Sequence, residues 1–304
     1  MTTDDALAED HNRRLNEEFY STHASHYFRH RLAFLALQAG KPQAVEDLLA
    51  EEFAWGSVKF SSPKNDQDGL EARTSKFVIT ESQVLLHHAS EALFRLFIAH
   101  AGAPACPWLE IASLTSFKTF HKYLDAFRAD PWRADLTNDA AHVFLGGRPT
   151  NADEQWNEAL QSSVRLIRLL ANRFHADRNM YNATKHGMAV TAGEGSIGIF
   201  TEDGRPVINT DGTQVTFLEH ETTSDHKNWY RKAQWFNAPQ AAWLTELALN
   251  QIDLLWDVAK HRYLGAPLDG LNVVTPEAID AALNNFPATG SVRSYRTLIA
   301  TEPL

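Results

Sequence analysis

The segment RFHADRNMYNATKHGM, residues 173–188, collects side chains that could bind an anion or transfer a proton. An imidazole with a pKa near neutrality suits general acid–base catalysis, and a guanidinium binds phosphate oxygens in pairs. Residues 158–186 contain five Arg or Lys and two acids, an excess that suits an anionic ligand or the ion pairs of a solvated helix. The candidate residues are Arg178 and His186 for catalysis and His175, Asn179, Asn182 and Lys185 for binding.

A helix predicted over residues 153–186 would bring these candidates beside its buried face. At about 100° per residue, the apolar stripe that ends at Phe174 continues into Arg178, Tyr181 and Lys185, and the remaining candidates form a neighbouring strip. Lys and His before a glycine are also what a helix C-terminus prefers, because cations meet the negative end of its dipole. The segment is therefore either a binding or catalytic site, or a satisfied polar network that closes one end of a helical bundle.

Three histidines near the N-terminus offer a different chemistry. His23, His26 and His30 are spaced i, i+3 and i+7, which places them on one face of a helix. With a ligand from another helix they would build a metal site in a bundle. They lack the Glu-x-x-His pairs that di-iron carboxylate bundles use. We predict no metal and no cofactor, and keep these histidines as alternative metal ligands.

Composition excludes several classes of protein. The chain has 304 residues with ordinary globular composition, and its net charge of -10 argues against a general nucleic-acid coat protein, although a small basic site remains compatible with it. No apolar run approaches the roughly 20 residues needed to cross a bilayer, so we expect no membrane partner. One cysteine, Cys106, and a polar N-terminus without a targeting signal indicate a cytoplasmic protein whose thiol belongs to the core.

Most of the chain shows helical periodicity, with Asp-Gly turns between short β-type runs after Gly187. The predicted fold class is mainly α: a helical bundle with a small antiparallel β-meander inserted before the last long helix. We predict a single domain over 1–304. Its parts are N-terminal helices and a loop (1–75), a core bundle (80–190 and 238–263), the meander (195–221) and a mostly irregular tail (264–304).

Local signals mark the ends and pairs of several helices. Thr80 is a plausible N-cap for a central apolar helix in which Glu91 and Arg95 are spaced for an ion pair. Asn237 precedes the last long helix. Further expectations are a helix over 9–38, a helix from Pro42, at most a helical turn within 129–153, a helical start at 224–236 and a short helix near 275–285.

The central apolar helix QVLLHHASEALFRLFIAHAG, followed by a later helix with Arg-Asn and a nearby His, resembles the HEPN domain family. The resemblance covers residues 80–190 and the helix at 238–263, and its motif matches Arg178, Asn179 and His186. Seven residues separate Arg178 from His186, one more than the family's pattern. The family contains helical toxins and defence ribonucleases, and also non-catalytic RNA- or nucleotide-binding modules.

The resemblance implies a metal-independent reaction on RNA. His186 would act as general acid or base, Arg178 would hold the phosphate, and the site would form in a homodimer. The leading functional hypothesis is therefore a HEPN-like RNA-binding or RNA-cleaving protein of a toxin or defence system. The alternatives are a non-catalytic protein-interaction module whose polar patch only caps the bundle, and a metal-dependent helical-bundle enzyme.

Overall fold

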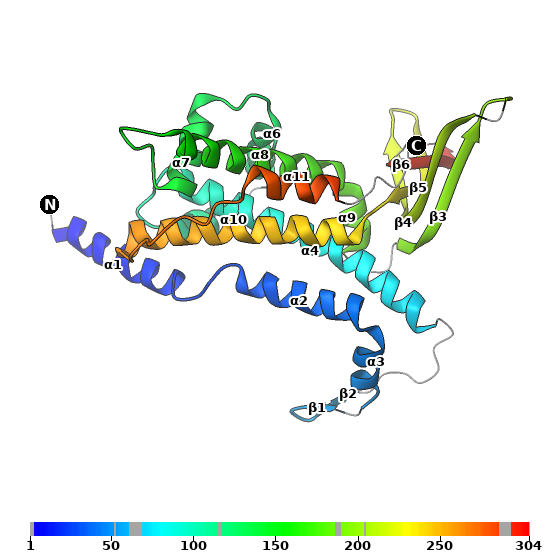
Figure 1. Ribbon diagram of the computed structural model, residues 1–304, viewed down its shortest axis with the longest axis horizontal. Coiled ribbons are helices and arrows are strands. Elements are labelled where there is room, and N and C mark those ends of the chain that lie inside the picture. The colour runs from blue at the N-terminus through cyan, green and yellow to red at the C-terminus, as the bar shows by residue number, and fades with distance from the viewer. Residues whose placement is uncertain are drawn as a thin grey trace. The chain divides into compact units, whose positions relative to one another are not determined.

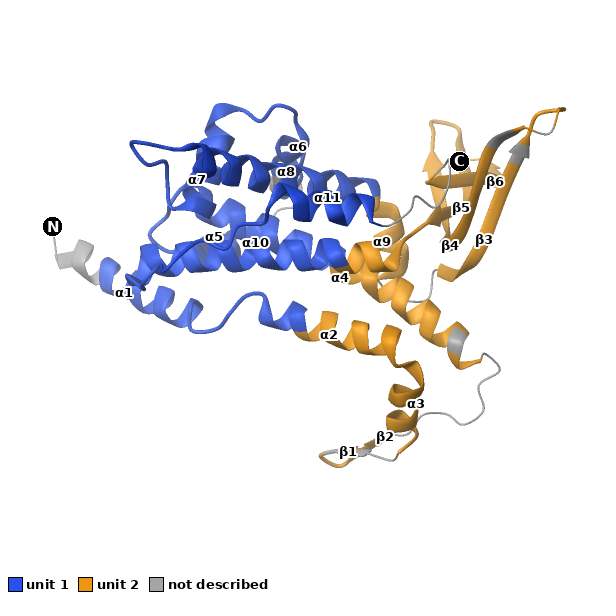
Figure 2. Cartoon of the chain, viewed as in Figure 1, with its two compact units in different colours: residues 1–29, 86–176, 243–285 blue, residues 30–85, 177–242, 286–304 orange. Residues whose placement is uncertain are grey.

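The computed structural model describes residues 3–51, 53–60, 69–114, 117–185, 190–203, 205–285 and 293–303 (Figure 1). The contacts between these residues divide the chain into two compact units, each assembled from separate stretches of sequence (Figure 2). Unit 1 comprises residues 1–29, 86–176 and 243–285, and unit 2 comprises residues 30–85, 177–242 and 286–304. The prediction of one domain over the whole chain stays a prediction, and each unit is described by itself.

Unit 1 is helical. Its elements are α1 (Thr3–Phe19), the start of α2 (His26–Gly40), the C-terminal part of α4 (Leu70–Ala101), α5 (Pro107–Ser113), α6 (Phe117–Arg128), α7 (Ala134–Leu145), α8 (Glu154–Ala176), most of α10 (Ala238–Leu264) and α11 (Pro276–Asn284). Helix α8 packs against α6 and α7. Phe97 lies at the centre, fully buried, with its ring centroid 5.2 Å from Phe127 and 5.6 Å from Phe144. Burial of such large rings supplies much of the hydrophobic stabilisation of this unit.

Unit 2 combines helices with a sheet. Its elements are most of α2, α3 (Pro42–Ala50), the hairpin β1 (Phe53–Trp55) and β2 (Val58–Phe60), the N-terminal part of α4, α9 (Arg178–Thr184), the start of α10, β3 (Val190–Phe200), β4 (Pro206–Thr222), β5 (His226–Trp235) and β6 (Ser294–Pro303). The last four strands form an antiparallel sheet in the order β3-β4-β5-β6.

The two faces of this sheet differ because side chains alternate along each strand. On β4, Val215 and Phe217 are buried, whereas Leu218, the residue after Phe217, has 58% of its surface exposed. Glu219 follows Phe217 on the same face and contacts α9 through Asn179, whose Nδ2 lies 3.1 Å from Oε2 of Glu219. We call this the α9 face, and the opposite one the open face.

The predicted fold class is wrong. Helices hold most of the described residues, as the periodicity indicates, but the sheet is neither small nor confined to residues 195–221. Strand β5 occupies 226–235, where a helical start is predicted, and β6 lies in the tail predicted as mostly irregular. The register pairs Ala233 of β5 with Tyr295 of β6. Because this pairing joins segments far apart in sequence, no local pattern could reveal it.

Several helix boundaries also differ from the predictions. The helix expected over 9–38 is interrupted between α1 and α2, and Thr80 lies inside α4, where its hydroxyl donates to the carbonyl of Lys76 at 2.7 Å. The segment 129–153 contains a full helix, α7, because Leu136, Ala140 and Phe144 recur on one buried side. Its Pro- and Asp-rich composition concealed that spacing.

Other local predictions are confirmed. Asn237 caps α10 by accepting the amide hydrogen of Gln240 at 2.8 Å, and Pro42 begins α3. Glu91 and Arg95 form the expected ion pair at 2.8 Å. The structure also shows α11 near the predicted position and Cys106 buried. These signals were readable because each depends on residues within one helical turn or at its end.

A buried hydrogen-bond chain in unit 1 generates a testable pH dependence. Nδ1 of His100 lies 2.6 Å from the carbonyl oxygen of Leu96, so Nδ1 carries the hydrogen and Nε2 accepts from the Tyr20 hydroxyl at 2.8 Å. Burial, helped by the charge of Arg262 and opposed by the Leu96 carbonyl, lowers the pKa of His100 from 6.5 to about 4. The native state therefore binds this proton less readily than the unfolded chain does.

We predict that the free energy of unfolding falls as the pH drops from 6.5 towards 4, with His100 contributing about 3 kcal/mol to the loss. The sign follows because the pKa of His100 is lower in the native state than in the unfolded chain. Such a histidine stabilises the native state at pH values above the unfolded pKa, and this stabilisation is lost as the pH falls. Urea unfolding at several pH values should show a shallower dependence in His100→Gln than in the unmodified protein. His226→Gln, at an exposed histidine, is the control and should show the same pH dependence as the unmodified protein. An equal pH dependence of the free energy of unfolding in all three proteins would contradict the prediction.

Candidate functional site

The predicted helix over 153–186 is interrupted, and this break changes the site. Helix α8 ends at Ala176, Asp177 takes φ −94° and ψ 3°, and α9 begins at Arg178. The helical phase of α8 therefore does not continue into α9. Asp177, Met180 and Thr184 are buried, whereas the prediction placed Arg178, Tyr181 and Lys185 on the continuation of the core stripe.

Asp177 explains how α9 is held on the sheet. Its carboxylate is nearly inaccessible, and Oδ1 accepts from Nε2 of Gln234 at 2.7 Å and from the guanidinium of Arg293. Its carbonyl also accepts the amide hydrogen of Tyr181 at 2.8 Å, which closes the first turn of α9. A buried carboxylate requires such partners, since leaving it unpaired costs several kcal/mol. The interaction joins α9 to β5 and to the residue that precedes β6.

A second contact of α9, made by the exposed Asn179, reaches a cluster of charges on the α9 face of the sheet. Glu219 lies between two cations, with Oε2 3.3 Å from Nζ of Lys232 and Oε1 4.0 Å from Nη1 of Arg296. Arg296 also pairs with Glu221. Asn179 belongs to this cluster through its bond to Glu219. Its amide is thus hydrogen-bonded to a carboxylate that neighbouring cations already balance.

The outward side of α9 carries three of the candidates. Arg178, Asn182 and Lys185 are exposed and spaced i, i+4 and i+7, so they share one stripe of the helix surface. Nζ of Lys185 lies 3.3 Å from Oδ1 of Asn182 and 5.8 Å from the ring centre of Tyr181. Within the described part of the chain, neither Arg178 nor Lys185 forms an ion pair. We call these three residues the α9 stripe.

The structure thus brings four of the six candidates together on α9. Arg178, Asn182 and Lys185 form the stripe and Asn179 lies beside it, whereas His175 is half-buried in the last turn of α8, in the other unit. The sixth candidate, His186, lies outside the described residues. The stripe thus presents two cations with an amide between them, and these are side-chain types that can bind phosphate.

Two of the cations of α8 have partners within unit 1. Arg168 lies 2.8 Å from Asp130, and Arg165 pairs with Asp280 of α11. The sequence left open whether the basic excess of this region serves an anionic ligand or ion pairs. For these two arginines the structure favours ion pairs.

The three histidines do not form a metal site. His23 precedes α2, and the ring of His26 stacks on it with centroids 5.0 Å apart. Burial lowers the pKa of His23, although Asp253, 3.2 Å from its Nδ1, opposes the shift. His30 is exposed and belongs to unit 2. Among the residues that the structure describes, no group of three or more His, Cys, Asp or Glu is arranged to hold a metal ion.

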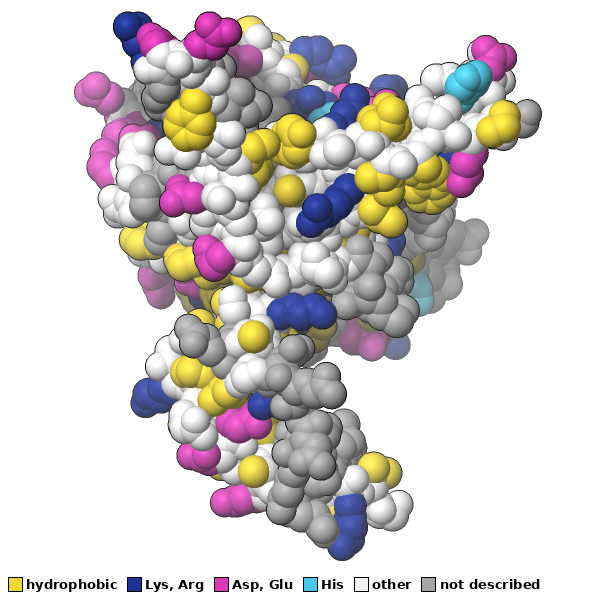
Figure 3. All heavy atoms as spheres, turned by 90° about the vertical axis from the view of Figure 1, so that its right-hand side faces the viewer, with side chains coloured by type: hydrophobic (Ala, Val, Ile, Leu, Met, Phe, Trp, Pro, Cys, Tyr) yellow, Lys and Arg dark blue, Asp and Glu magenta, His cyan; other side chains and the backbone are white. Residues whose placement is uncertain are grey.

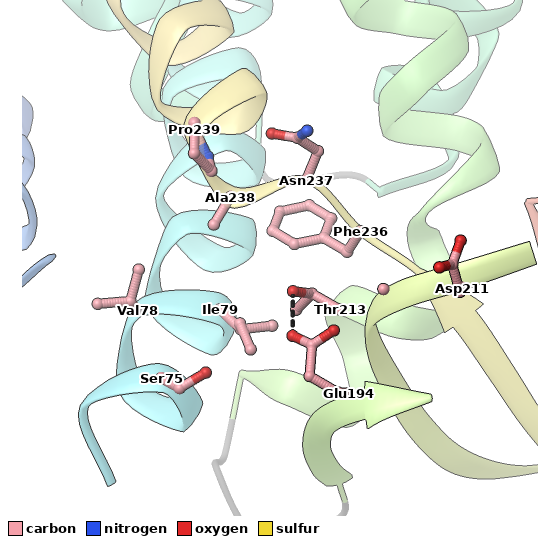
Figure 4. A pocket seen from close by; sticks show the side chains of 11 residues that line it. Ser75, Val78, Ile79, Glu194, Asp211, Thr213, Phe236, Asn237, Ala238 and Pro239 are labelled. Carbon is pink, nitrogen blue, oxygen red and sulfur yellow. Dashed lines mark hydrogen bonds between the residues drawn. The ribbon is translucent and has the colours of Figure 1, made fainter. Parts of the chain in front are cut away.

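A cavity of about 570 Å³ in unit 2 was not predicted (Figure 4). Ile79 and Phe236 form apolar walls, and Glu194 accepts a hydrogen bond from the Thr213 hydroxyl at 2.8 Å. Asp211 also lines it, so its charged groups are acidic and repel phosphate. The residues come from α4, two strands and the start of α10, and no sequence spacing connects them. This cavity therefore differs in charge from the α9 stripe.

Comparisons with known protein families, with curated proteins and with solved structures find no match. The described helices include none that is both long enough and apolar enough to span a bilayer. Function must accordingly be argued from the side chains themselves.

The contacts of the Asp177 carboxylate with Gln234 and Arg293, which we call the Asp177 clamp, predict an effect on stability. Asp177→Asn removes the charge that faces Arg293 while keeping the volume, and we expect the free energy of unfolding to fall by about 2 kcal/mol. Urea unfolding measures the change. Asp135→Asn, in an exposed ion pair with Arg133, is the matched control and should change stability by less than about 0.5 kcal/mol. Similar small losses in both variants would show that the clamp contributes little.

Proposed function

We propose that this protein binds RNA through the α9 stripe, with Arg178 and Lys185 contacting phosphates and Asn182 between them. The observation that supports the proposal is the exposure of two cations on one side of a helix whose other side is clamped by Asp177. A clamped helix presents its side chains with little further loss of conformational entropy on binding. A guanidinium is suited to bidentate phosphate contacts, and an ammonium to a point contact.

The spacing of the stripe favours a polynucleotide over a single nucleotide. Arg178 and Lys185 are seven residues apart, or about 10 Å along the helix axis. That separation is about three times the axial rise between successive phosphates of one duplex strand, which is about 3.4 Å. The two cations therefore suit separate phosphates of one strand. The choice of RNA over DNA rests on the resemblance to the HEPN family, which also implies a homodimer and a place in a toxin or defence system.

Cleavage of the bound RNA is the further step that the resemblance implies. The described cations would hold the phosphate and stabilise charge in the transition state. Proton transfer would fall to His186, whose ordinary pKa near neutrality suits a general acid or base. A cytoplasmic location is part of this proposal, and there the buried thiol of Cys106 would remain reduced.

Removing the two cations should weaken RNA binding and its dependence on salt. For a fluorescent single-stranded RNA, we expect the Arg178→Ala, Lys185→Ala double variant to reduce the slope of log Kobs against log salt by about 1.4, from about 0.7 for each lost phosphate contact. Fluorescence anisotropy at several salt concentrations measures the slope.

The matched control for this experiment is Arg133→Ala, which removes an exposed cation of α7. It should leave the slope unchanged. Equal binding by the double variant and the unmodified protein would contradict the proposed function. An equal loss in the control would show that only the overall charge of the protein matters.

The catalytic step has its own test. If the protein cleaves RNA, cleavage should persist in excess chelator and fall about 100-fold or more in His186→Ala, because general acid–base catalysis contributes at least that factor. Binding of RNA by this variant should remain. Gel analysis of a labelled RNA measures cleavage. Unchanged cleavage in His186→Ala would remove His186 from the mechanism, and intact RNA with normal binding would leave a non-catalytic RNA-binding module.

A further inference from the structure

The open face of the sheet carries exposed aromatic and cationic side chains. The strand register identifies the residues on this face: Leu218 pairs with Arg231, His220 with Trp229, and Ala233 with Tyr295. Leu218 and Tyr295 expose 58% and 43% of their surfaces. Arg231 and His220 are exposed as well. Figure 3 shows hydrophobic side chains close to Lys and Arg side chains on the displayed surface.

These side chains occupy successive rows across the strands. Along β5, Ala233, Arg231 and Trp229 are two residues apart, so their rows are about 7 Å apart. Tyr295 lies in the row of Ala233 and is therefore diagonal to Arg231, within reach of a long side chain. A ring, a guanidinium and a second ring thus follow one another across the surface. All three have flat faces on which a nucleic-acid base can stack.

The rings of Trp229 and Tyr295 differ in how far neighbouring side chains cover them. Trp229 is half-buried, with Nζ of Lys227 4.3 Å from its ring centre and the His220 ring 5.0 Å away. Tyr295 lies on β6, an edge strand whose ten residues are all exposed. The accessible stacking surface is therefore centred on Tyr295 and Arg231, with the Trp229 group at its border.

The charges of this face suit an anionic partner such as a nucleic acid. Arg231 and Lys227 are its cations, and the acid paired directly across from Lys227 is Glu302, at the end of β6. The carboxylates of Glu219 and Glu221 lie on the opposite, α9 face. A sheet face with aromatic rings, a central guanidinium and few acids has the properties that single-stranded RNA-binding sheets use.

We infer that the open face is a second RNA subsite, in which Tyr295 stacks on a base and Arg231 stacks on a neighbouring base or binds its phosphate. This inference rests on the proposed function, because it concerns the same ligand class. It adds a distinction: the α9 stripe binds the phosphates, which are common to all RNA sequences, whereas the open face contacts the bases.

The experiment compares two fluorescent oligonucleotides of equal length and charge, an oligouridylate and its abasic counterpart, by fluorescence anisotropy. Tyr295→Ala should weaken oligouridylate binding about 5- to 100-fold, the range expected for one lost stacking contact. Tyr295→Phe should bind normally because it keeps the ring. Neither substitution should change binding of the abasic strand. Tyr123→Ala, which removes a ring 37% exposed on α6, is the matched control and should have no effect.

The outcomes separate this inference from the proposed function. Loss of binding in the α9 double variant with normal binding in Tyr295→Ala would overturn the open-face subsite and leave the α9 stripe intact. Equal weakening of both oligonucleotides by Tyr295→Ala would also overturn it, since no base would be involved. If Tyr295→Ala binds RNA normally but converts a dimer into a monomer in light scattering, the face is a contact between copies of the chain and the inference is wrong.

Discussion

The buried carboxylate of Asp177 is the interaction on which the arrangement of unit 2 depends. It accepts from Gln234 in the middle of the sheet and from Arg293 just before β6, while its own backbone starts α9. One short side chain therefore joins three segments that are distant in sequence. A carboxylate removed from water is stable only when hydrogen-bond donors surround it. The helix break at Asp177 therefore depends on the donors that Gln234 and Arg293 supply to its buried carboxylate.

The clamp also determines what α9 offers to solvent. With Asp177, Met180 and Thr184 directed inward, the opposite side must carry Arg178, Asn182 and Lys185. Had α8 continued without interruption, Arg178 and Lys185 would have followed the core stripe and required buried partners. Because of the break, the polar residues that the sequence placed along the buried face of one long helix are exposed on α9 instead. An exposed site favours binding of an extended ligand over enclosure of a small one.

Side chains that alternate along the strands give the sheet a charged α9 face and an open face with aromatic side chains. Residues two apart on β4 and β5 supply the charged network beneath α9, and their neighbours supply the open face. Glu219 and Glu221 balance Lys232 and Arg296 on one side, which leaves Arg231 among apolar side chains on the other. The carboxylates of Glu219 and Glu221 therefore lie on the face opposite to Arg231 and Tyr295.

The sequence by itself determined features that depend on near neighbours. The cap at Asn237, the start of α3 at Pro42 and the Glu91–Arg95 pair are governed by residues within about four positions, and all three could be predicted. The sequence also identified the polar segment, residues 173–188, that contains α9.

Only the tertiary structure decided that β6 completes the sheet, that Asp177 is the buried member of the polar segment, and that the stripe faces outward. Each of these depends on a partner far along the chain, such as Gln234 or Arg293 for Asp177. Helical periodicity carries no information about such partners, because a hydrogen bond to a distant strand can override the phase that the local pattern predicts.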